Sequence, residues 1–157
     1  MIAAGSPAVD TFDPVLRRVR KNGMAGSKRK RRRSRDENRR RFEEAADLYL
    51  EDCYARQRPV SVKEFAAGYL EATQPYLSRI APQLIGTSIG NFLRSRQLAH
   101  AEELLRRTPA KVTVLQIAMA SGFGTPWTFT RWFRVAYGTT PAKYRARMAE
   151  RGARRRR

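Results

Sequence analysis

Apolar side chains recur at spacings of three and four residues along most of the chain from Ser34 to Met148, and this is the period of an amphipathic α-helix. No stretch shows the strict alternation of apolar and polar positions that predicts a half-buried strand. The pattern therefore predicts an all-α fold with about seven helices. They are expected over residues 34–54, 61–70, 74–80, 88–107, 113–120, 126–137 and 141–148.

Capping residues mark several of the helix ends. Ser34 and Glu37 form a capping box at the start of the first helix, because each side chain can bond the backbone of the other residue. Thr113 is the expected N-cap of the short helix 113–120. Thr125 followed by Pro126 is a typical N-cap with proline in the first helical position, and Gly138 is a typical helix stop. The boundaries of helix 126–137 are therefore the best defined in the chain.

Pro82 conflicts with the helix that begins after Thr73. A proline inside a helix removes one hydrogen bond and clashes with the preceding turn, at a cost of ~3 kcal/mol. This helix is therefore predicted to kink or to stop near Ile80. Farther along the chain, the sequence "SGFG" predicts a tight turn in which Gly122 adopts a positive φ angle.

Helix 126–137 divides its aromatic residues between two faces. At 100° per residue, one face is predicted to pack on the core, with Trp132 at its edge and partly buried. That face consists of Phe129, Trp132, Phe133, Ala136 and Tyr137. The opposite face consists of Trp127, Thr128, Thr130, Arg131 and Arg134. An exposed indole gains nothing from packing, so Trp127 requires an explanation.

Two interpretations of Trp127 remain open. In the first, its ring folds back on Arg131, four residues later, as a surface cation–π pair. In the second, the outer face of the helix enters a major groove of DNA. A short helix, a turn with glycine and a second helix give the spacing of a helix-turn-helix, whose second helix presents its first turns to base edges.

The second interpretation assigns a chemical role to each outer side chain. Arg131 can bond a guanine edge, and the indole of Trp127 can pack on thymine methyl groups. Thr128 and Thr130 can reach bases or phosphates. Thr125 offers its hydroxyl and the free helix N-terminus to a phosphate. Arg134 belongs to the same DNA-binding face.

The net charge of +19 is distributed unevenly. Residues 1–35 hold eleven Lys or Arg against two Asp, and the tail 151–157 adds five Arg. We expect the arm 1–33 to be disordered or weakly helical, and both basic ends to bind any polyanion without sequence preference. Residues 36–103 hold nine basic and eleven acidic side chains, whereas residues 104–150 hold eight basic side chains and one Glu. The C-terminal half of the folded region therefore suits a nucleic-acid surface better.

Other classes of site lack the residues they need. Cys53 and His100 are the only residues of their kinds, so neither a disulfide framework nor a zinc cluster can be built. Cys53 is expected in the core and His100 at the surface. The sequence contains neither a glycine loop that could bind phosphate nor a pair of carboxylates that would face inward, so nothing in it indicates an enzyme. No window has the ~20 apolar residues of a membrane span. The sequence predicts a cytoplasmic protein without catalytic activity, cofactor or metal.

Several motifs between Phe92 and Met148 occur together: "FLRSRQLAHAEELL", "IA" followed by "GF", the pair Phe129 and Phe133, and "GTTPAKYR". On these motifs, this part of the chain resembles the DNA-binding domain of the AraC/XylS transcription regulators. It implies two helix-turn-helix units joined by a rigid helix, each placing its second helix in successive major grooves. A linker helix of ~20 residues spans ~30 Å, close to the ~34 Å between such grooves.

The resemblance sets the expected organisation of the chain. It comprises a basic arm (1–33), a helix with a first helix-turn-helix (34–86), a linker helix (87–108), a second helix-turn-helix with the last helix (109–150), and a basic tail (151–157). It also implies a stand-alone bacterial regulator without a small-molecule effector domain. Such a regulator binds double-stranded DNA as a monomer at the nucleoid and contacts RNA polymerase near promoters.

The first helix-turn-helix fits the family pattern less well than the second. It is one residue longer than usual, Glu71 stands where the family turn carries glycine, and Ala81 stands where a core phenylalanine is expected. Its half of the chain is also net negative, which repels phosphate. The remaining candidate readers are Gln74, Tyr76, Ser78 and Arg79. The second unit is therefore predicted to carry most of the recognition. The first unit is either a weakened reader, with Arg79 as its strongest candidate, or a structural or protein-docking module.

Three functions compete on these observations. The first is a sequence-specific transcription regulator that reads DNA mainly through helix 126–137 and its cap. The second is an architectural or recombination-accessory protein that coats or bends DNA, and the third is an RNA-binding protein, which the lack of exposed strand aromatics disfavours. A regulator should prefer its operator over other DNA by ~10³ or more.

Overall fold

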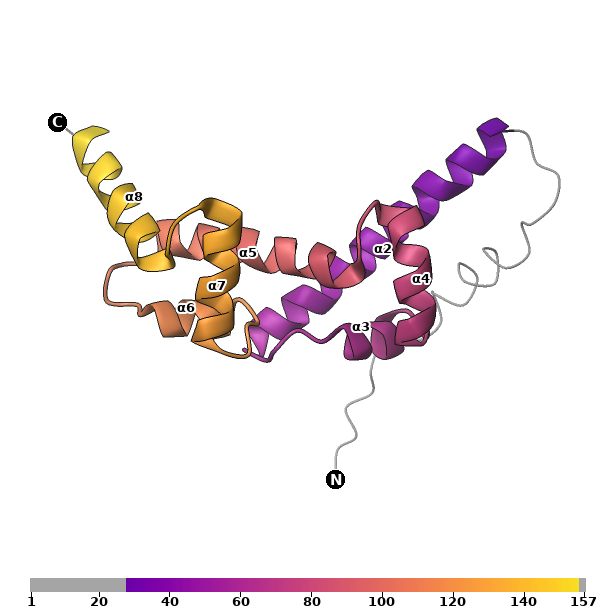
Figure 1. Cartoon of the computed structure of the whole chain (residues 1–157), viewed down its shortest axis with the longest axis horizontal. Coiled ribbons are helices and arrows are strands. Elements are labelled where there is room, and N and C mark those ends of the chain that lie inside the picture. The colour runs from indigo at the N-terminus through magenta and orange to yellow at the C-terminus, as the bar shows by residue number, and fades with distance from the viewer. Residues whose placement is uncertain (1–27, 156–157) are drawn as a thin grey trace, which may run out of the picture. The chain divides into compact units, whose positions relative to one another are not determined.

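The computed structural model describes residues 28–155, which form seven α-helices and no strand (Figure 1). The predicted all-α fold is thereby confirmed. The helices are α2 (Lys28–Ala55), α3 (Val62–Tyr69), α4 (Gln74–Ile85), α5 (Ile89–Arg107), α6 (Val114–Ala120), α7 (Pro126–Tyr137) and α8 (Pro141–Arg155). Within this part of the chain, no helix combines the length and the apolar character that crossing a membrane requires.

The first and last helices are longer than the sequence pattern predicted. α2 begins at Lys28, so Ser34 lies inside the helix rather than at its N-cap. Lys and Arg are good helix formers, and neither Gly nor Pro occurs between Lys28 and Ala55. α8 likewise continues to Arg155. The remainder of the predicted basic arm and tail, residues 1–27 and 156–157, lies outside the described residues.

The chain divides into two compact units, each with its own core. The first unit contains residues up to Tyr49 together with Ser61–Ile89, and the second contains Leu50–Val60 together with the residues from Gly90 onward. Each unit holds one consecutive helix pair of the predicted helix-turn-helix type, α3 with α4 and α6 with α7. The second unit also includes the end of α2 and the loop that follows it.

The core of the first unit takes its aromatic rings from α2 and α3. Phe42 and Tyr49 lie on one face of α2, and their ring centroids are 5.5 Å and 5.4 Å from that of Phe65. Tyr49 also lies 5.1 Å from Tyr69 in an edge-to-face arrangement. Ala81 of α4 is fully buried. Ala81 therefore belongs to the core of the first unit, whose aromatic rings come from α2 and α3.

A hydrogen-bonded tyrosine joins α2 to the start of α3. The Tyr49 hydroxyl accepts a hydrogen bond from Ser61 N–H at 2.7 Å and donates to the Ser61 carbonyl at 3.0 Å. Ser61 is also the N-cap of α3, where its hydroxyl accepts from Glu64 N–H. The buried end of Tyr49 therefore fixes the entry of the chain into the first helix pair.

Of the two outcomes predicted for the helix after Thr73, a kink or a stop near Ile80, the stop is wrong. α4 continues through Pro82 to Ile85, and Gly86 ends it in the left-handed conformation with φ 76°. Because Pro82 has no backbone N–H, the helix loses one internal hydrogen bond. Only one helical turn follows Pro82. Burial of Ala81 and Ile85 holds that last turn in place.

The turn between α3 and α4 contains Glu71 with φ 46°. A residue with a Cβ atom in this left-handed region is strained by ~1–2 kcal/mol. Ala72 N–H still reaches the Ala66 carbonyl at 2.9 Å. The turn therefore keeps the glycine-type conformation without glycine.

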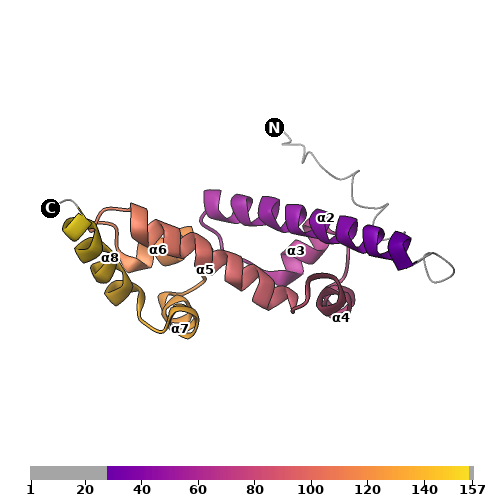
Figure 2. The ribbon, with the colours of Figure 1, turned by 90° about the horizontal axis from the view of Figure 1, so that it is seen from above.

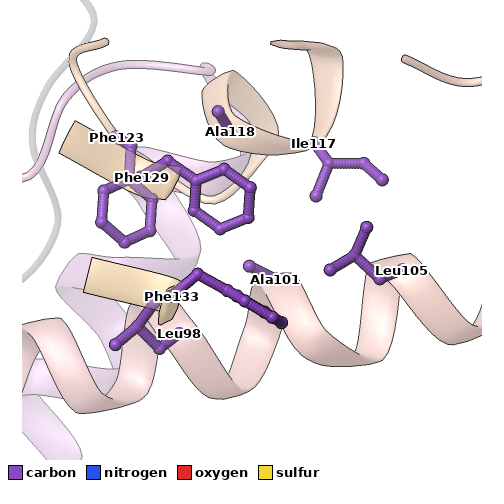
Figure 3. Close-up of a cluster of buried hydrophobic side chains, with 8 residues drawn as sticks. All are labelled: Leu98, Ala101, Leu105, Ile117, Ala118, Phe123, Phe129 and Phe133. Atoms are coloured by element: carbon purple, nitrogen blue, oxygen red, sulfur yellow. The ribbon is translucent and has the colours of Figure 1, made fainter. Parts of the chain in front are cut away.

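The second unit is built on a cluster of eight buried residues (Figure 3). Three phenylalanines from the turn and from α7 pack on the apolar face of α5, and α6 covers the far side. The cluster consists of Leu98, Ala101, Leu105, Ile117, Ala118, Phe123, Phe129 and Phe133. In both general views, α6, α7 and α8 lie beside the C-terminal part of α5 (Figure 1, Figure 2).

Candidate nucleic-acid interface

Caps define the helix pair α6 and α7 as the sequence predicted. Thr113 and Gln116 form a capping box at the start of α6. The Thr125 hydroxyl accepts from Thr128 N–H at 3.2 Å at the start of α7. Gly138 then ends α7 in the left-handed conformation with φ 68°. Capping or stop residues therefore mark both ends of α7 and the start of α6 in the second helix-turn-helix.

The turn between these helices is held from behind by α5 and by the loop after α2. Gly122 has φ 70°, as predicted. Val60 N–H donates to the Gly122 carbonyl at 2.9 Å, and the buried Gln97 Nε2 donates to the Ser121 and Gly122 carbonyls at 3.1 and 2.8 Å. A Cβ atom on Gly122 would lie 2.8 Å from Val60 Cγ2. The start of α7 is thus fixed by several independent contacts.

The inner face of α7 follows the prediction for most of its length. Phe129 and Phe133 are fully buried, and Trp132 is half-buried at the edge of the core. Ala136 is exposed, which corrects its assignment to the core stripe. Tyr137 is 37 % exposed and stacks on Phe133 with a centroid distance of 4.4 Å. The core ends at this ring, so the last turn of α7 has nothing to bury Ala136 against.

The outer face of α7 presents the residues that were predicted there. Trp127 is 70 % exposed, and Arg131 and Arg134 are exposed as well. Thr128 and Thr130 are half-buried, so their hydroxyls are less accessible than predicted for direct readers. The Thr128 hydroxyl is also engaged with the Thr125 hydroxyl at 2.8 Å. The large exposed groups are therefore one indole and two guanidinium ions.

The Trp127 indole and the Arg131 guanidinium belong to a longer series of stacked rings and guanidinium ions. The Arg131 Cζ atom lies 5.5 Å from the Trp127 ring and 5.6 Å from the Trp132 ring. On the other helix, the Arg94 Cζ atom lies 3.9 Å from the Trp132 ring. We call Arg94, Trp132, Arg131 and Trp127 the stacked series. The surface cation–π pair predicted as one interpretation is therefore present, and it is part of a larger arrangement.

Sequence reasoning missed Arg94. It lies on α5, where it donates from Nη1 to the Asn91 side-chain oxygen at 3.0 Å, and burial lowers its pKa from the usual value. Nothing in the linear sequence "LRSR" separates Arg94 from its neighbour Arg96. Only the packing of α5 against α7 distinguishes the two.

Contacts of α8 fix the far end of the second unit. The Tyr144 hydroxyl donates to Glu102 of α5, and burial together with this carboxylate raises the pKa of Tyr144 to about 12. Arg145 donates to the Val112 carbonyl ahead of α6. The Tyr144 ring also packs edge-on against Phe133 at 5.5 Å. α8 is thereby tied to the helix pair through its first two turns.

The candidate readers of the first unit are arranged more loosely. Gln74, Ser78 and Arg79 are exposed, Tyr76 is half-buried, and the Arg79 Cζ atom lies 5.6 Å from the Tyr76 ring. The Thr73 hydroxyl forms no capping hydrogen bond with α4. These four candidate readers thus include one stacked pair, Arg79 with Tyr76, whereas the second unit holds the stacked series of four residues.

Cys53 and His100 both take part in packing. Cys53 is fully buried, as predicted. His100 is half-buried, which corrects its predicted place at the open surface, and its ring stacks on Tyr54 at 4.0 Å with an interplanar angle of 3°. Burial lowers the pKa of His100. Among the described residues, no group of three or more His, Cys, Asp or Glu side chains could hold a metal ion.

Known proteins share this arrangement. A family model described as a helix-turn-helix domain matches residues 66–147. The chain is 32 % identical over 99 residues to the probable transcription factor PqrA of Proteus vulgaris, covering 62 % of this chain and 77 % of that protein. It is 35 % identical over 79 residues to the transposon Tn10 TetD protein of Escherichia coli, covering 50 % of this chain and 54 % of that protein.

A solved structure is similar over a larger part of the chain. The DNA-binding domain of the global transcriptional factor AdpA, crystallised with a target DNA, has a TM-score of 0.60 and 24 % sequence identity. The match covers 70 % of this chain and 94 % of that domain. At this identity the likeness supports the fold, with its two helix-turn-helix units. The family model and the sequence relatives show that the chain belongs to the AraC family of sequence-specific DNA-binding transcription regulators and is not an enzyme.

Proposed function

We propose that this regulator reads its operator mainly through α7, which inserts its first turns into a major groove. The observation that carries the proposal is the exposure of Trp127 beside Arg131 on the outer face of the second helix of the pair. In the free protein an indole that is 70 % exposed gains little from packing beyond its contact with Arg131. It gains contact area when a base edge covers it.

The chemistry of each side chain suggests what it contacts. The Arg131 guanidinium can donate two parallel hydrogen bonds to guanine O6 and N7. The flat face of Trp127 can cover the 5-methyl group of a neighbouring thymine. Thr125, Thr128, Thr130 and Arg134 are assigned to phosphates or neighbouring base edges, with Thr128 and Thr130 contributing less because they are half-buried.

Genome-wide footprinting of the wild type beside Trp127→Ala tests the proposal. The wild type should protect sites with a shared sequence motif, and the variant should blur or shift one position of that motif. An operator in which uracil replaces thymine at that position removes only the methyl group. It should weaken the wild type and leave Trp127→Ala unaffected. Diffuse protection that does not change with the mutation would instead support a protein that coats DNA.

The first unit is proposed as the weaker reader. Its candidate side chains Gln74, Tyr76, Ser78 and Arg79 carry one guanidinium ion, and its half of the chain is net negative. Arg79 stacked on Tyr76 is its best-presented group. We infer that α4 adds affinity through Arg79 and that α7 sets the sequence.

We propose that one chain suffices to bind an operator. Two helix-turn-helix units in a single chain can supply two reading helices, a task that otherwise requires a dimer. On the family resemblance, the protein would act on the bacterial chromosome in the cytoplasm and contact RNA polymerase near promoters. Sedimentation of the protein with a 20–25 base-pair operator, roughly two helical turns long, tests the first point. A complex with two chains would contradict it.

The architectural or recombination-accessory function remains as a second candidate because of the charge of +19. The ratio of operator affinity to random-DNA affinity at physiological salt separates the two functions. A ratio of ~10³ or more supports the regulator, whereas a ratio near one supports the coating protein. Competition with structured RNA addresses the RNA-binding alternative in the same assay.

A further inference from the structure

α8 carries a stripe of exposed cations, which are separate from the side chains of α7 that are proposed to read bases. Lys143, Arg147, Arg151 and Arg154 are all exposed. Their spacings of four, four and three residues place them within an arc of about 80° on the helix surface. We call these four residues the α8 stripe. The matched family model ends at residue 147, so half of the stripe lies beyond it.

The other side of α8 is already committed to packing. Pro141 is buried, and Tyr144, Arg145 and Met148 are half-buried. Arg145 differs from the stripe because it donates to the Val112 carbonyl. The stripe therefore consists of the cations that packing leaves in solvent.

Ion pairing also distinguishes the stripe from Arg106 and Arg107, the exposed arginines at the end of α5. Arg106 and Arg107 on α5 form ion pairs with Glu102 and Glu103. Among the described residues, no carboxylate forms an ion pair with a cation of the stripe. Glu150 is the only acidic residue of α8. The stripe therefore presents nearly uncompensated positive charge.

The dimensions of the stripe match a polyanion with regular spacing. Eleven residues of helix separate its ends, a rise of ~16 Å. One strand of duplex DNA carries a phosphate every ~3.4 Å along the axis, so this length faces about five phosphates. Four arginine or lysine side chains can neutralise most of them.

We propose that the α8 stripe is a second, sequence-independent DNA-binding site that lies along the phosphates beside the groove entered by α7. The inference rests on the proposed role of α7, because α8 is fixed to α7 by the contact of Tyr144 with Phe133. Reading by α7 brings the duplex to the same unit, which favours DNA over an acidic protein as the occupant. The stripe adds affinity and leaves the choice of sequence to α7.

The double variant Arg147→Gln/Arg151→Gln tests the proposal, with Arg106→Gln/Arg107→Gln as a control of equal charge change. Affinity for an operator and for random DNA is measured from 50 to 300 mM salt. The stripe variant should reduce the slope of log K against log salt by about two, and weaken both DNAs by similar factors. The control should change the slope by less than half of that amount. Unchanged slopes for the stripe variant would overturn the proposal.

Further outcomes separate the possible causes. Arg147→Lys/Arg151→Lys keeps the charge and should keep the slope, and circular dichroism shows whether each variant remains helical. Loss of operator binding alone would show that the stripe reads bases, which overturns a sequence-independent site. Intact DNA binding with lost activation by RNA polymerase would assign the stripe to an acidic protein surface instead. Failure of the α7 proposal shows separately, as an operator motif that Trp127→Ala does not change.

Discussion

The guanidinium group of Arg94 stacks over the ring of Trp132, with 3.9 Å between the Arg94 Cζ atom and the ring centroid. Arg94 belongs to α5 and Trp132 to α7, so the contact joins the supporting helix to the reading helix. Arg131 lies near the Trp132 ring as well as the Trp127 ring. The half-buried contact between Arg94 and Trp132 is thereby connected to Arg131 and Trp127, the two side chains proposed to meet bases. The connection orders Arg131 before DNA is present.

Removal of the Arg94 guanidinium should loosen that order. A desolvated cation–π contact contributes roughly 1–2 kcal/mol, so Arg94→Ala should lower the free energy of unfolding by about that amount. Operator affinity should fall about 3- to 10-fold, because each 1.4 kcal/mol is tenfold in affinity and only part of the loss reaches Arg131. Urea unfolding and fluorescence anisotropy with a labelled operator measure the two effects. Arg94→Lys keeps the charge and loses the planar stack, so full recovery in this variant would contradict the stacking account.

The turn before α7 should tolerate no side chain at Gly122. Gly122→Ala forces a left-handed backbone at ~1–2 kcal/mol and places a methyl group against Val60, at a further ~1–3 kcal/mol for overpacking. Gly138 is a matched control, because its φ of 68° is similar and no other atom lies within 4 Å of the added Cβ. Thermal unfolding should show a clearly larger loss for Gly122→Ala than for Gly138→Ala. Equal losses would mean that backbone strain alone sets the cost.

Relief of strain at Glu71 should stabilise the first unit. Glu71 has φ 46°, and the gain from glycine there is ~1–2 kcal/mol, reduced by ~0.4–1 kcal/mol through the greater freedom of the unfolded chain. Glu71→Gly should therefore raise the free energy of unfolding by about 0.5–1 kcal/mol. Glu71→Gln keeps the strained backbone and removes the charge. An equal gain in both variants would assign the effect to charge.

Much of the fold followed from local sequence signals, because these signals act through neighbouring residues. The caps at Thr113 and Thr125 and the positive φ angles at Gly122 and Gly138 depend on one or two side chains each, and the structure confirms them. The division of α7 into an inner and an outer face followed from helical period alone for Phe129 and Trp127. These predictions needed no knowledge of the partner helices.

The sequence predictions failed at positions where contacts with other helices decide the structure. Pro82 was expected to kink α4 or to end it; the helix does not end there, because burial of the turn that follows offsets the cost of one lost hydrogen bond. His100 was expected in solvent because its helical face is polar, yet Tyr54 from α2 covers its ring. Ala136 has the right period for the core and meets no partner there. Arg94 could be singled out only by the position of Trp132.

His100 should make the second unit less stable in mild acid. Burial lowers its pKa in the folded state below the usual value near 6.5, so the unfolded state binds more protons as the pH falls through that region. The stability from neutral His100 is therefore complete above the unfolded pKa and is lost as the pH falls below it. Urea unfolding at pH 7.5 and 5.0 should show a smaller decrease for His100→Gln than for the wild type. A decrease of the same size in both proteins would exclude His100 as the source.

The two reading helices should differ in what their arginines contribute. Arg131 stands in the stacked series next to Trp127, and a bidentate contact with guanine contributes about 1–3 kcal/mol of discrimination against other bases. Arg131→Ala should therefore weaken operator binding by roughly 5- to 150-fold while random DNA is bound almost as before. Arg79 has only Tyr76 to order it, so Arg79→Ala should weaken operator and random DNA by similar, smaller factors. Anisotropy titrations of both variants against both DNAs measure the difference, and because each substitution removes one charge, the pair controls for charge. An equal loss of specificity from the two substitutions would show that the first unit reads bases as strongly as the second.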